Sequence, residues 1–314
     1  MRLAILDDYL DSARYAADWS VLAPTVDVTV FTQVIPAQDL VTVLQPFDIL
    51  VVMRERTRLD AQVIRALPNL KLLVTTGMRN ASIDLPACRE QGVAVMGTEG
   101  LPAITVDIAW LLILNLVKQF NHNQISAHHP AWQHTLPGGL YGKTLGVVGL
   151  GKIGTRMAAI AQAFGMHVIA WSQNLTPDRA SAQGVVAVTK DELFQQSDIV
   201  SLHLVLSERT RHCVASHEFA LMKPSTYLIN TSRSGLVDET ALLYALHQKQ
   251  IAGAGLDVFE HEPLPCNAPI LQAPNVVLTP HLGYVTRENF AVFYGQALEN
   301  VRVWLKGGQI RSLL

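Results

Sequence analysis

The sequence predicts an α/β protein built from two doubly wound parallel sheets, and three observations carry this prediction. Its 314 residues are about twice the ~150 residues expected of one domain, so two domains are expected. Short β-branched runs alternate with longer stretches of helical periodicity along almost the whole chain, which is typical of a parallel sheet covered by helices. One strand-to-helix junction also carries three closely spaced glycines.

The predicted strands fall into two sets. The first set is Leu3–Leu6, Val28–Phe31, Ile49–Val52, Leu72–Thr75 and Val93–Met96. The second set is Leu145–Val148, Val168–Trp171, Ile199–Leu204, Tyr227–Asn230, Ala254–Val258 and Val276–Thr279. A last helix is predicted over about Arg287–Leu305, beyond the second set. A return of the chain to the first domain then gives one domain of residues 1–102 and 287–314, with residues 103–286 inserted as the other.

Two segments separate the sets. Thr105–Phe120 has almost no polar face, so it predicts a helix buried on all sides, either between domains or between subunits. The next segment, Asn121–Gly142, is rich in His, Asn, Pro and Gly and predicts a loop. Its histidines, including His128, His129 and His134, show no metal-ligand spacing. We expect surface histidines there and no metal site.

Composition excludes several classes of protein. A formal net charge of −2 argues against a nucleic-acid binder that relies on a basic face. Only 16% of the residues are charged and the mean hydropathy is positive, yet no apolar run approaches the ~20 residues of a membrane-spanning helix. Cys88, Cys213 and Cys266 lack CxxC spacing, and the apolar stretch Met1–Leu6 is too short for a signal peptide. We therefore expect reduced thiols, a cytoplasmic location and no membrane partner.

The glycine-rich junction follows the first strand of the second set. Gly149 permits a tight turn, Gly151 lets the backbone approach a pyrophosphate, and Gly154 lets the helix pack on the strand. At Lys152 and Ile153 the helix begins, and its free N–H groups would face the anion. Strand, loop and helix occur in the required order, which predicts a dinucleotide site. The plain alternative is a glycine-rich turn that binds nothing.

The next strand bears on the identity of the dinucleotide. It ends where an acidic residue would hold the ribose 2′-OH of NAD, and here that residue is Ser172. Neither Gln173 nor Asn174 supplies a carboxylate that would repel a 2′-phosphate. No Arg or Lys stands adjacent to attract one, the nearest in the sequence being Arg179. The predicted cofactor is a nicotinamide dinucleotide, NAD or NADP, with its phosphate state open.

Three polar residues follow strands of the second set, at the sheet edge where open α/β sheets place their sites. Arg233 can bind a carboxylate through two hydrogen bonds. His281 can give a proton to a carbonyl oxygen because imidazole titrates near neutral pH. Glu262 can orient that imidazole and favour its charged form. Taken singly, each could be an ordinary surface or loop residue; together they suit the reduction of a 2-oxo acid.

Five motifs make the chain resemble the D-isomer-specific 2-hydroxyacid dehydrogenase family along essentially its whole length. They are GKTLGVVGLGKIG (142–154), SDIVSLHLVLSERTRH (197–212), LINTSRSGLVDE (228–239), AGLDVFEHEPLP (254–265) and TPHLGYVT (279–286). The family includes phosphoglycerate dehydrogenases, glyoxylate/hydroxypyruvate reductases and D-lactate dehydrogenases. The resemblance implies a Rossmann NAD(P)-binding domain inserted in a flavodoxin-like substrate-binding domain.

The resemblance also implies catalytic roles. Arg233 would bind the substrate carboxylate, and Glu262 would pair with His281, the acid/base. In the first domain, the loop with Gly77 and Met78 matches the segment whose N–H groups hold that carboxylate. The family usually has a second glycine where Arg79 stands, so the substrate is not named by the sequence.

Cofactor contacts are implied in the same way. Asp257 matches the residue that holds the nicotinamide carboxamide. His203 and Thr210 match the segment beside the adenosine and the nicotinamide ribose, with Val205 in place of the usual proline.

The sequence thus predicts an NAD(P)-dependent oxidoreductase that transfers a hydride between the cofactor and C2 of a small D-2-hydroxy or 2-oxo acid. One alternative is a dinucleotide-sensing regulatory protein, since relatives of this fold include corepressors. Another is a formate-dehydrogenase-like hydride donor, but such relatives carry Gln rather than Glu at the position of Glu262. The apolar helix Thr105–Val117 predicts a homodimer.

Overall fold

The computed structural model describes residues 1–126 and 135–314, and the chain divides into two compact units. The smaller unit comprises residues 1–101 and 285–314, and the larger unit comprises residues 102–284. Both are α/β units with purely parallel sheets, which confirms the predicted fold class. The three histidines expected on the loop after Asn121 lie outside the described residues.

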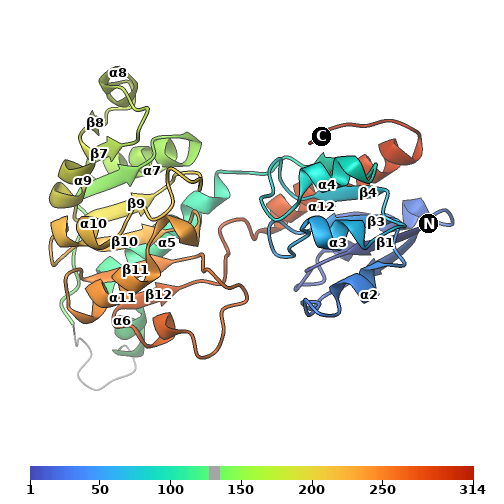
Figure 1. The fold of residues 1–314 in the computed structure, drawn as a ribbon. Coiled ribbons are helices and arrows are strands. Elements are labelled where there is room, and N and C mark those ends of the chain that lie inside the picture. The colour runs from blue at the N-terminus through green and yellow to red at the C-terminus, as the bar shows by residue number, and fades with distance from the viewer. Residues whose placement is uncertain (127–134) are drawn as a thin grey trace. The chain divides into compact units, whose positions relative to one another are not determined.

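The smaller unit has a five-stranded sheet in the order β2-β1-β3-β4-β5 (Figure 1). Its strands are β1 (Arg2–Ile5), β2 (Asp27–Val30), β3 (Ile49–Val52), β4 (Leu72–Thr75) and β5 (Ala94–Gly97). Its helices are α1 (Ala13–Ala16), α2 (Leu40–Leu44), α3 (Ala61–Arg65), α4 (Leu85–Glu90) and α12 (Arg287–Leu305). The strand order is that of flavodoxin-like sheets.

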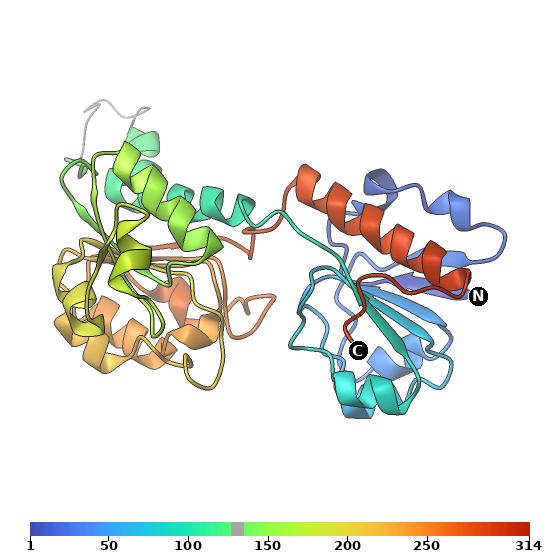
Figure 2. The same cartoon turned by 90° about the horizontal axis from the view of Figure 1, so that it is seen from above.

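Helix α12 belongs to this unit although it follows the larger one in sequence, and Figure 2 shows it along one side of the sheet, opposite α3 and α4. It packs against α1 and β4. Its buried residues Phe290, Phe293, Ala297 and Val301 recur every three or four positions, so a single apolar stripe faces the sheet. Thr286 begins the helix by accepting the N–H of Asn289.

The larger unit has a seven-stranded sheet in the order β12-β11-β10-β9-β6-β7-β8. Its strands are β6 (Thr144–Val148), β7 (His167–Trp171), β8 (Val186–Ala187), β9 (Ile199–Leu202), β10 (Tyr227–Asn230), β11 (Gly253–Leu256) and β12 (Val276–Leu278). Its helices are α5 (Ile104–Lys118), α6 (Phe120–Ser126), α7 (Lys152–Ala163), α8 (Pro177–Ser181), α9 (Lys190–Gln196), α10 (Ser216–Leu221) and α11 (Glu239–His247). The strand order reverses between β6 and β9, which is the switch point where such sheets bind dinucleotides.

Two layers of helix cover this sheet. Helices α5 and α7 pack on one face, around Leu112, Ile113, Val147 and Met157. On the other face, α9, α10 and α11 enclose a second core. The central strands are buried on both faces, which explains their continuous apolar runs and the low share of charged residues. Among the described helices, none is both long and apolar enough to cross a membrane.

One sequence prediction is corrected here. The segment from Asn121 is predicted to be a loop, but α6 extends to Ser126; local hydrogen bonds support this helix, including that of the Asn123 N–H with the Gln119 carbonyl.

The helix α5 is predicted to be buried on all sides, between domains or between subunits. Within this chain it contacts β10, β11, β12 and α7, which bury only part of its surface, and Leu111 is 51% exposed.

Candidate active site

The glycine loop lies at the switch point, between the end of β6 and the start of α7. Gly149 has φ of +103°, and a Cβ there would stand 2.8 Å from the carbonyl oxygen of His203 at the end of β9. A Cβ on Gly154 would collide with the carbonyl oxygen of Gly149, so this glycine allows the close approach of helix and loop. A Cβ on Gly151, in contrast, would meet nothing within 4 Å.

The open space beside Gly151 lies at the beginning of α7. Gly151 is the N-cap and forms no side-chain cap, so the first N–H groups of the helix have no side-chain acceptor from that residue. Lys152 is exposed, and Ile153 is half-buried against the core under α7. An open backbone cradle at the positive end of a helix fits a pyrophosphate.

Two further residues that could bind a cofactor, His203 and Thr210, follow the neighbouring strand β9. The Nε2 of His203 is 2.9 Å from the Ser201 hydroxyl, and burial lowers the pKa of the imidazole to about 4, so the ring is neutral at physiological pH. Its Nδ1 is buried and has no partner among the described residues. Thr210 donates its hydroxyl proton to the Val205 carbonyl oxygen at 2.7 Å, which closes the turn after β9.

Thr231 is a candidate that the sequence analysis missed. It follows β10 directly, and its buried Oγ1 has no partner among the described residues. Buried polar atoms are almost always hydrogen-bonded, so the orphaned atoms of Thr231 and His203 mark places where a bound polar group would complete the site. Its position between the strand β10 and Arg233 could have identified Thr231 from the sequence.

The imidazole of His281 and the carboxylate of Glu262 form the central contact of the site. The distance from Nδ1 to Oε2 is 2.6 Å. Because a carboxylate only accepts, Nδ1 donates and Nε2 faces away from this bond. The His281 ring also meets the Tyr284 ring edge to face, with centroids 5.1 Å apart.

Two further contacts set the charge of Glu262. Burial by itself would raise the pKa of its carboxyl, but the hydrogen bond and charge of His281, the Phe259 N–H and the charge of Arg233 bring that pKa below its usual value. Arg233 donates to the Ser232 carbonyl oxygen at 2.7 Å. The three residues predicted from the sequence are thus brought together at one edge of the sheet.

Asp257 holds the loop that carries His281. Its buried Oδ1 accepts from the Thr279 hydroxyl at 2.6 Å and the Leu282 N–H at 2.7 Å, and its Oδ2 accepts from the Gly283 N–H at 2.8 Å. Burial raises the pKa of this carboxyl despite these bonds. His281 itself has φ of +54°, an uncommon conformation for a residue other than glycine. Asp257 and its three donors hold this backbone in place.

The substrate loop predicted in the smaller unit follows β4. The Gly77 N–H already donates to the Thr98 hydroxyl at 2.9 Å. Within the described chain, the N–H groups of Met78 and Arg79 have no backbone acceptor. Gly77 has φ of +99°, and a Cβ there would collide with Nη1 of Arg54, a residue that the sequence analysis did not select.

Arg54 follows β3 in the same way as Gly77 follows β4. This position after a strand could have identified Arg54 from the sequence. Its N–H donates to the Thr76 hydroxyl at 2.9 Å, and its carbonyl oxygen accepts from the Asn80 amide at 2.5 Å. These bonds join the two strand ends and bring a guanidinium against the loop. Among the described residues, no group of His, Cys, Asp and Glu could hold a metal ion.

Comparisons with known proteins point to one family. Residues 110–283 match the family model of the D-isomer specific 2-hydroxyacid dehydrogenase NAD binding domain. A glyoxylate reductase of Thermococcus litoralis is 36% identical over 241 residues, covering 74% of this chain and 72% of that protein. A hydroxypyruvate reductase of Thermotoga maritima is 35% identical over 268 residues, covering 83% and 86%.

A solved structure is similar as well. It is a phosphoglycerate oxidoreductase of Vibrio cholerae, 37% identical, with a TM-score of 0.92 over 98% of this chain and all of that one. The chain also matches phosphoglycerate dehydrogenases, but it spans only about half the length of several of them.

Proposed function

The chain belongs to the D-isomer-specific 2-hydroxyacid dehydrogenase family, and from this premise we propose that it interconverts a small D-2-hydroxy acid and its 2-oxo acid with NAD or NADP. The bond between His281 and Glu262 is the single observation that carries the proposal furthest. It orients the His281 imidazole on the same sheet that carries the glycine loop, which supports an acid/base role for this residue. When bound, the nicotinamide supplies or accepts the hydride.

His281 would move the proton. Its Nδ1–H is held by Glu262, so Nε2 is the atom available to a substrate oxygen. In the reducing direction Nε2–H donates to the carbonyl oxygen while C2 is reduced, and in the oxidising direction Nε2 accepts the hydroxyl proton. Glu262 stays ionised at neutral pH because its pKa is lowered, so a negative charge lies beside the imidazole that moves the proton.

Carboxylate binding is proposed for Arg233 and for the loop after β4. The guanidinium of Arg233 matches a carboxylate in geometry and charge. In the smaller unit, Met78 and Arg79 offer backbone N–H groups, whereas Gly77 would act through its shape because its own N–H binds Thr98. Arg54 adds a positive charge to this loop.

Cofactor binding is proposed for the residues around the switch point. Gly149, Gly151 and Gly154 shape the cradle, and the N–H groups of Lys152 and Ile153 would face the pyrophosphate. His203 and Ser172 directly follow β9 and β7, and Thr210 closes the turn after β9. Asp257 would meet the carboxamide, and with three acceptor positions already filled it has one lone pair left for this.

The test is a screen of NADH and NADPH oxidation against glyoxylate, hydroxypyruvate, pyruvate and bulkier 2-oxo acids. We expect turnover with at least one small 2-oxo acid, and chiral analysis of a product such as glycerate or lactate should show the D-isomer. Cofactor binding with no turnover of any of these acids would contradict the proposal and favour the regulatory alternative.

We further propose a homodimer formed through α5 and α7. Leu111 is 51% exposed and Phe120 55%, while Phe164, 41% exposed, contacts Trp110 with ring centroids 5.1 Å apart. Tyr141, 88% exposed, lies against Gly165. Large exposed apolar surfaces of this kind mark interaction sites.

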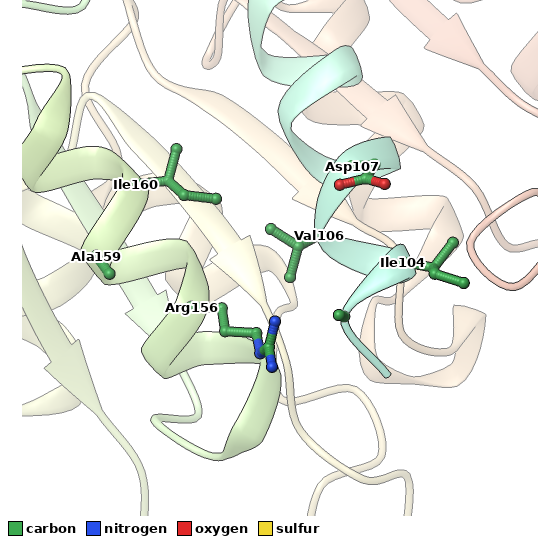
Figure 3. A pocket seen from close by; sticks show the side chains of 7 residues that line it. Ile104, Val106, Asp107, Arg156, Ala159 and Ile160 are labelled. Carbon is green, nitrogen blue, oxygen red and sulfur yellow. The ribbon is translucent and has the colours of Figure 1, made fainter. Parts of the chain in front are cut away.

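A pocket of about 320 Å³ lies between α5 and α7 (Figure 3). It is lined by Ala103, Ile104, Val106 and Asp107 around the start of α5 and by Arg156, Ala159 and Ile160 of α7. Asp107 and Leu111, like Ile160 and Phe164, are four residues apart, so pocket and apolar side chains share the same helix faces. Light scattering at micromolar concentration should give twice the chain mass of 34.4 kDa, and a monomer would contradict the dimer.

A cytoplasmic location is part of the same proposal. Cys88, Cys213 and Cys266 are free thiols, and Cys266 is exposed. Reduced thiols are typical of the cytosol.

A further inference from the structure

We propose that the loop 172–175 and Arg179 form a binding site for the 2′-phosphate of NADP(H), which makes NADP(H) the preferred cofactor. The proposal rests on the function proposed above and deepens it. The sequence alone leaves the choice between NAD and NADP open.

The loop leaves the sheet directly beside the glycine cradle. Gly149 donates its N–H to the carbonyl oxygen of Trp171, the last residue of β7, at 2.8 Å. In sheets of this strand order, the residue after this strand meets the 2′-position of the adenosine ribose. That residue is Ser172 in this chain.

The loop presents donors and no carboxylate. Ser172 carries a hydroxyl, and Gln173 and Asn174 carry amides, each of which can donate to a phosphate oxygen. The turn is closed by the Leu175 N–H, which donates to the Ser172 carbonyl oxygen at 3.0 Å. An acidic residue here would repel a 2′-phosphate, and its absence removes the usual barrier to NADP(H).

Arg179 supplies the positive charge. It stands seven positions after Ser172, but α8 turns it back so that Nη1 donates to the Asn174 carbonyl oxygen at 3.3 Å. Arg179 is exposed, and among the described residues no carboxylate forms an ion pair with it, although Asp178 precedes it on α8. Its guanidinium fork is suited to a phosphate.

A second cation near β7 is already neutralised. Lys190 lies over the Trp171 ring, with Nζ 5.8 Å from the centroid. Its Nζ pairs with Glu218 at 2.7 Å, so we give Lys190 no part in the site. Arg179 is therefore the cation of the proposal, and a phosphate monoester with close to two negative charges is the ligand that suits it.

The first test measures binding without turnover. Titration calorimetry compares 2′,5′-ADP with 5′-AMP, two probes that differ only in the 2′-phosphate. We expect 2′,5′-ADP to bind about tenfold tighter or more. Equal affinity for the two probes would overturn the proposal.

Variants of Arg179 and Ser172 test whether these residues cause the difference in affinity between the two probes. Arg179→Gln should weaken 2′,5′-ADP about tenfold and leave 5′-AMP unchanged, whereas Arg302→Gln, an exposed control on α12, should change neither. Ser172→Asp should reverse the order of the two probes. If Arg179→Gln leaves the affinity for 2′,5′-ADP unchanged, the site is not the one proposed.

Kinetics separate this proposal from the function on which it rests. Preference for NADPH over NADH in kcat/KM, lost in Arg179→Gln, supports the site. Equal use of the two cofactors by an active enzyme overturns the site and leaves the dehydrogenase function intact. Preferential binding of 2′,5′-ADP by a chain that reduces no 2-oxo acid supports the site and contradicts the function.

Discussion

The loops that follow β6 and β12 are held in shape by opposite means. The loop after β6 depends on missing side chains, because a Cβ on Gly154 would collide with the backbone and one on Gly149 would crowd it. The loop after β12 depends on a present side chain, since the buried carboxylate of Asp257 accepts three hydrogen bonds from it. We propose that the first loop binds a cofactor through its backbone shape, which does not depend on pH, and that the second holds His281 for proton transfer, which does depend on charge. Substitutions in the two loops should therefore have different effects: those in the first should impair cofactor binding, and those in the second should impair proton transfer.

The largest expected effect belongs to the loop after β12. His281→Ala should lower kcat by about 10³–10⁴-fold, because the general acid/base is removed. The dissociation constant for the cofactor should stay within about twofold, because the glycine cradle is not touched. The matched control is His261→Ala, an exposed neighbour of Glu262 in sequence. Near-normal turnover of His281→Ala would contradict the assignment.

Two alanine substitutions distinguish the contribution of the glycine loop to stability from its contribution to cofactor binding. Gly154→Ala should lower the free energy of unfolding by about 3 kcal/mol, because its Cβ must displace backbone. Gly151→Ala should change stability by less than about 0.5 kcal/mol, because its Cβ enters open space, yet it should weaken cofactor binding about tenfold. Thermal unfolding and cofactor fluorescence titration measure the two quantities. Intact cofactor binding in Gly151→Ala would show that the open space is not the pyrophosphate site.

His203 makes stability depend on pH near the cofactor loop. Its pKa is lowered from 6.5 to about 4, so below about pH 6.5 the unfolded chain takes up a proton that the folded chain refuses. Stability is therefore lost as pH falls from about 6.5 towards 4, by about 2 kcal/mol at pH 5. His203→Gln should reduce this loss between pH 7.5 and 5 in denaturant titrations. An unchanged slope would show that the ring is not neutral and buried in the folded state.

The smallest effect concerns Glu262, which links charge to catalysis. Glu262→Gln keeps an acceptor for Nδ1 but removes the negative charge beside the imidazole. Reduction should slow about tenfold near neutral pH, and the acidic limit that comes from protonation of Glu262 should be absent from the pH profile of the variant. Because the pKa of Glu262 is lowered, the wild-type carboxylate loses its charge only in more acidic solution. A pH profile of kcat/KM that does not shift would remove Glu262 from the proton-transfer role.

Much of the fold could be predicted because it depends on local pattern. The β-branched runs of buried strands and the apolar stripe of α12 are visible in the sequence, and α12 begins and ends at the expected residues. The strand β8 was missed because it has only two residues at the sheet edge, where little apolar surface is buried. The sequence left open whether a domain or a second subunit covers the apolar face of α5, since composition does not show which neighbour covers a helix face; within this chain Leu111 is exposed.

The candidate site was predictable where residue type and strand position coincide, as at Arg233, Glu262 and His281. The sequence did not show that Asp257 holds the His281 loop, because its three donors lie 22 to 26 residues further on. The sequence also did not show that Arg179 donates to the Asn174 carbonyl oxygen, because this contact depends on the turn of the chain at α8. Contacts of this kind depend on backbone geometry rather than on spacing.

Isotope transfer tests the central claim most directly. The reduced cofactor, carrying deuterium at the transferable C4 position, is oxidised in the presence of hydroxypyruvate or another reactive 2-oxo acid from the screen, and the product is analysed by NMR and mass spectrometry. We predict one deuterium on C2 of the D-2-hydroxy acid, with an unlabelled hydroxyl proton that reaches the oxygen through His281. A product without deuterium at C2, or one of L-configuration, would contradict the account.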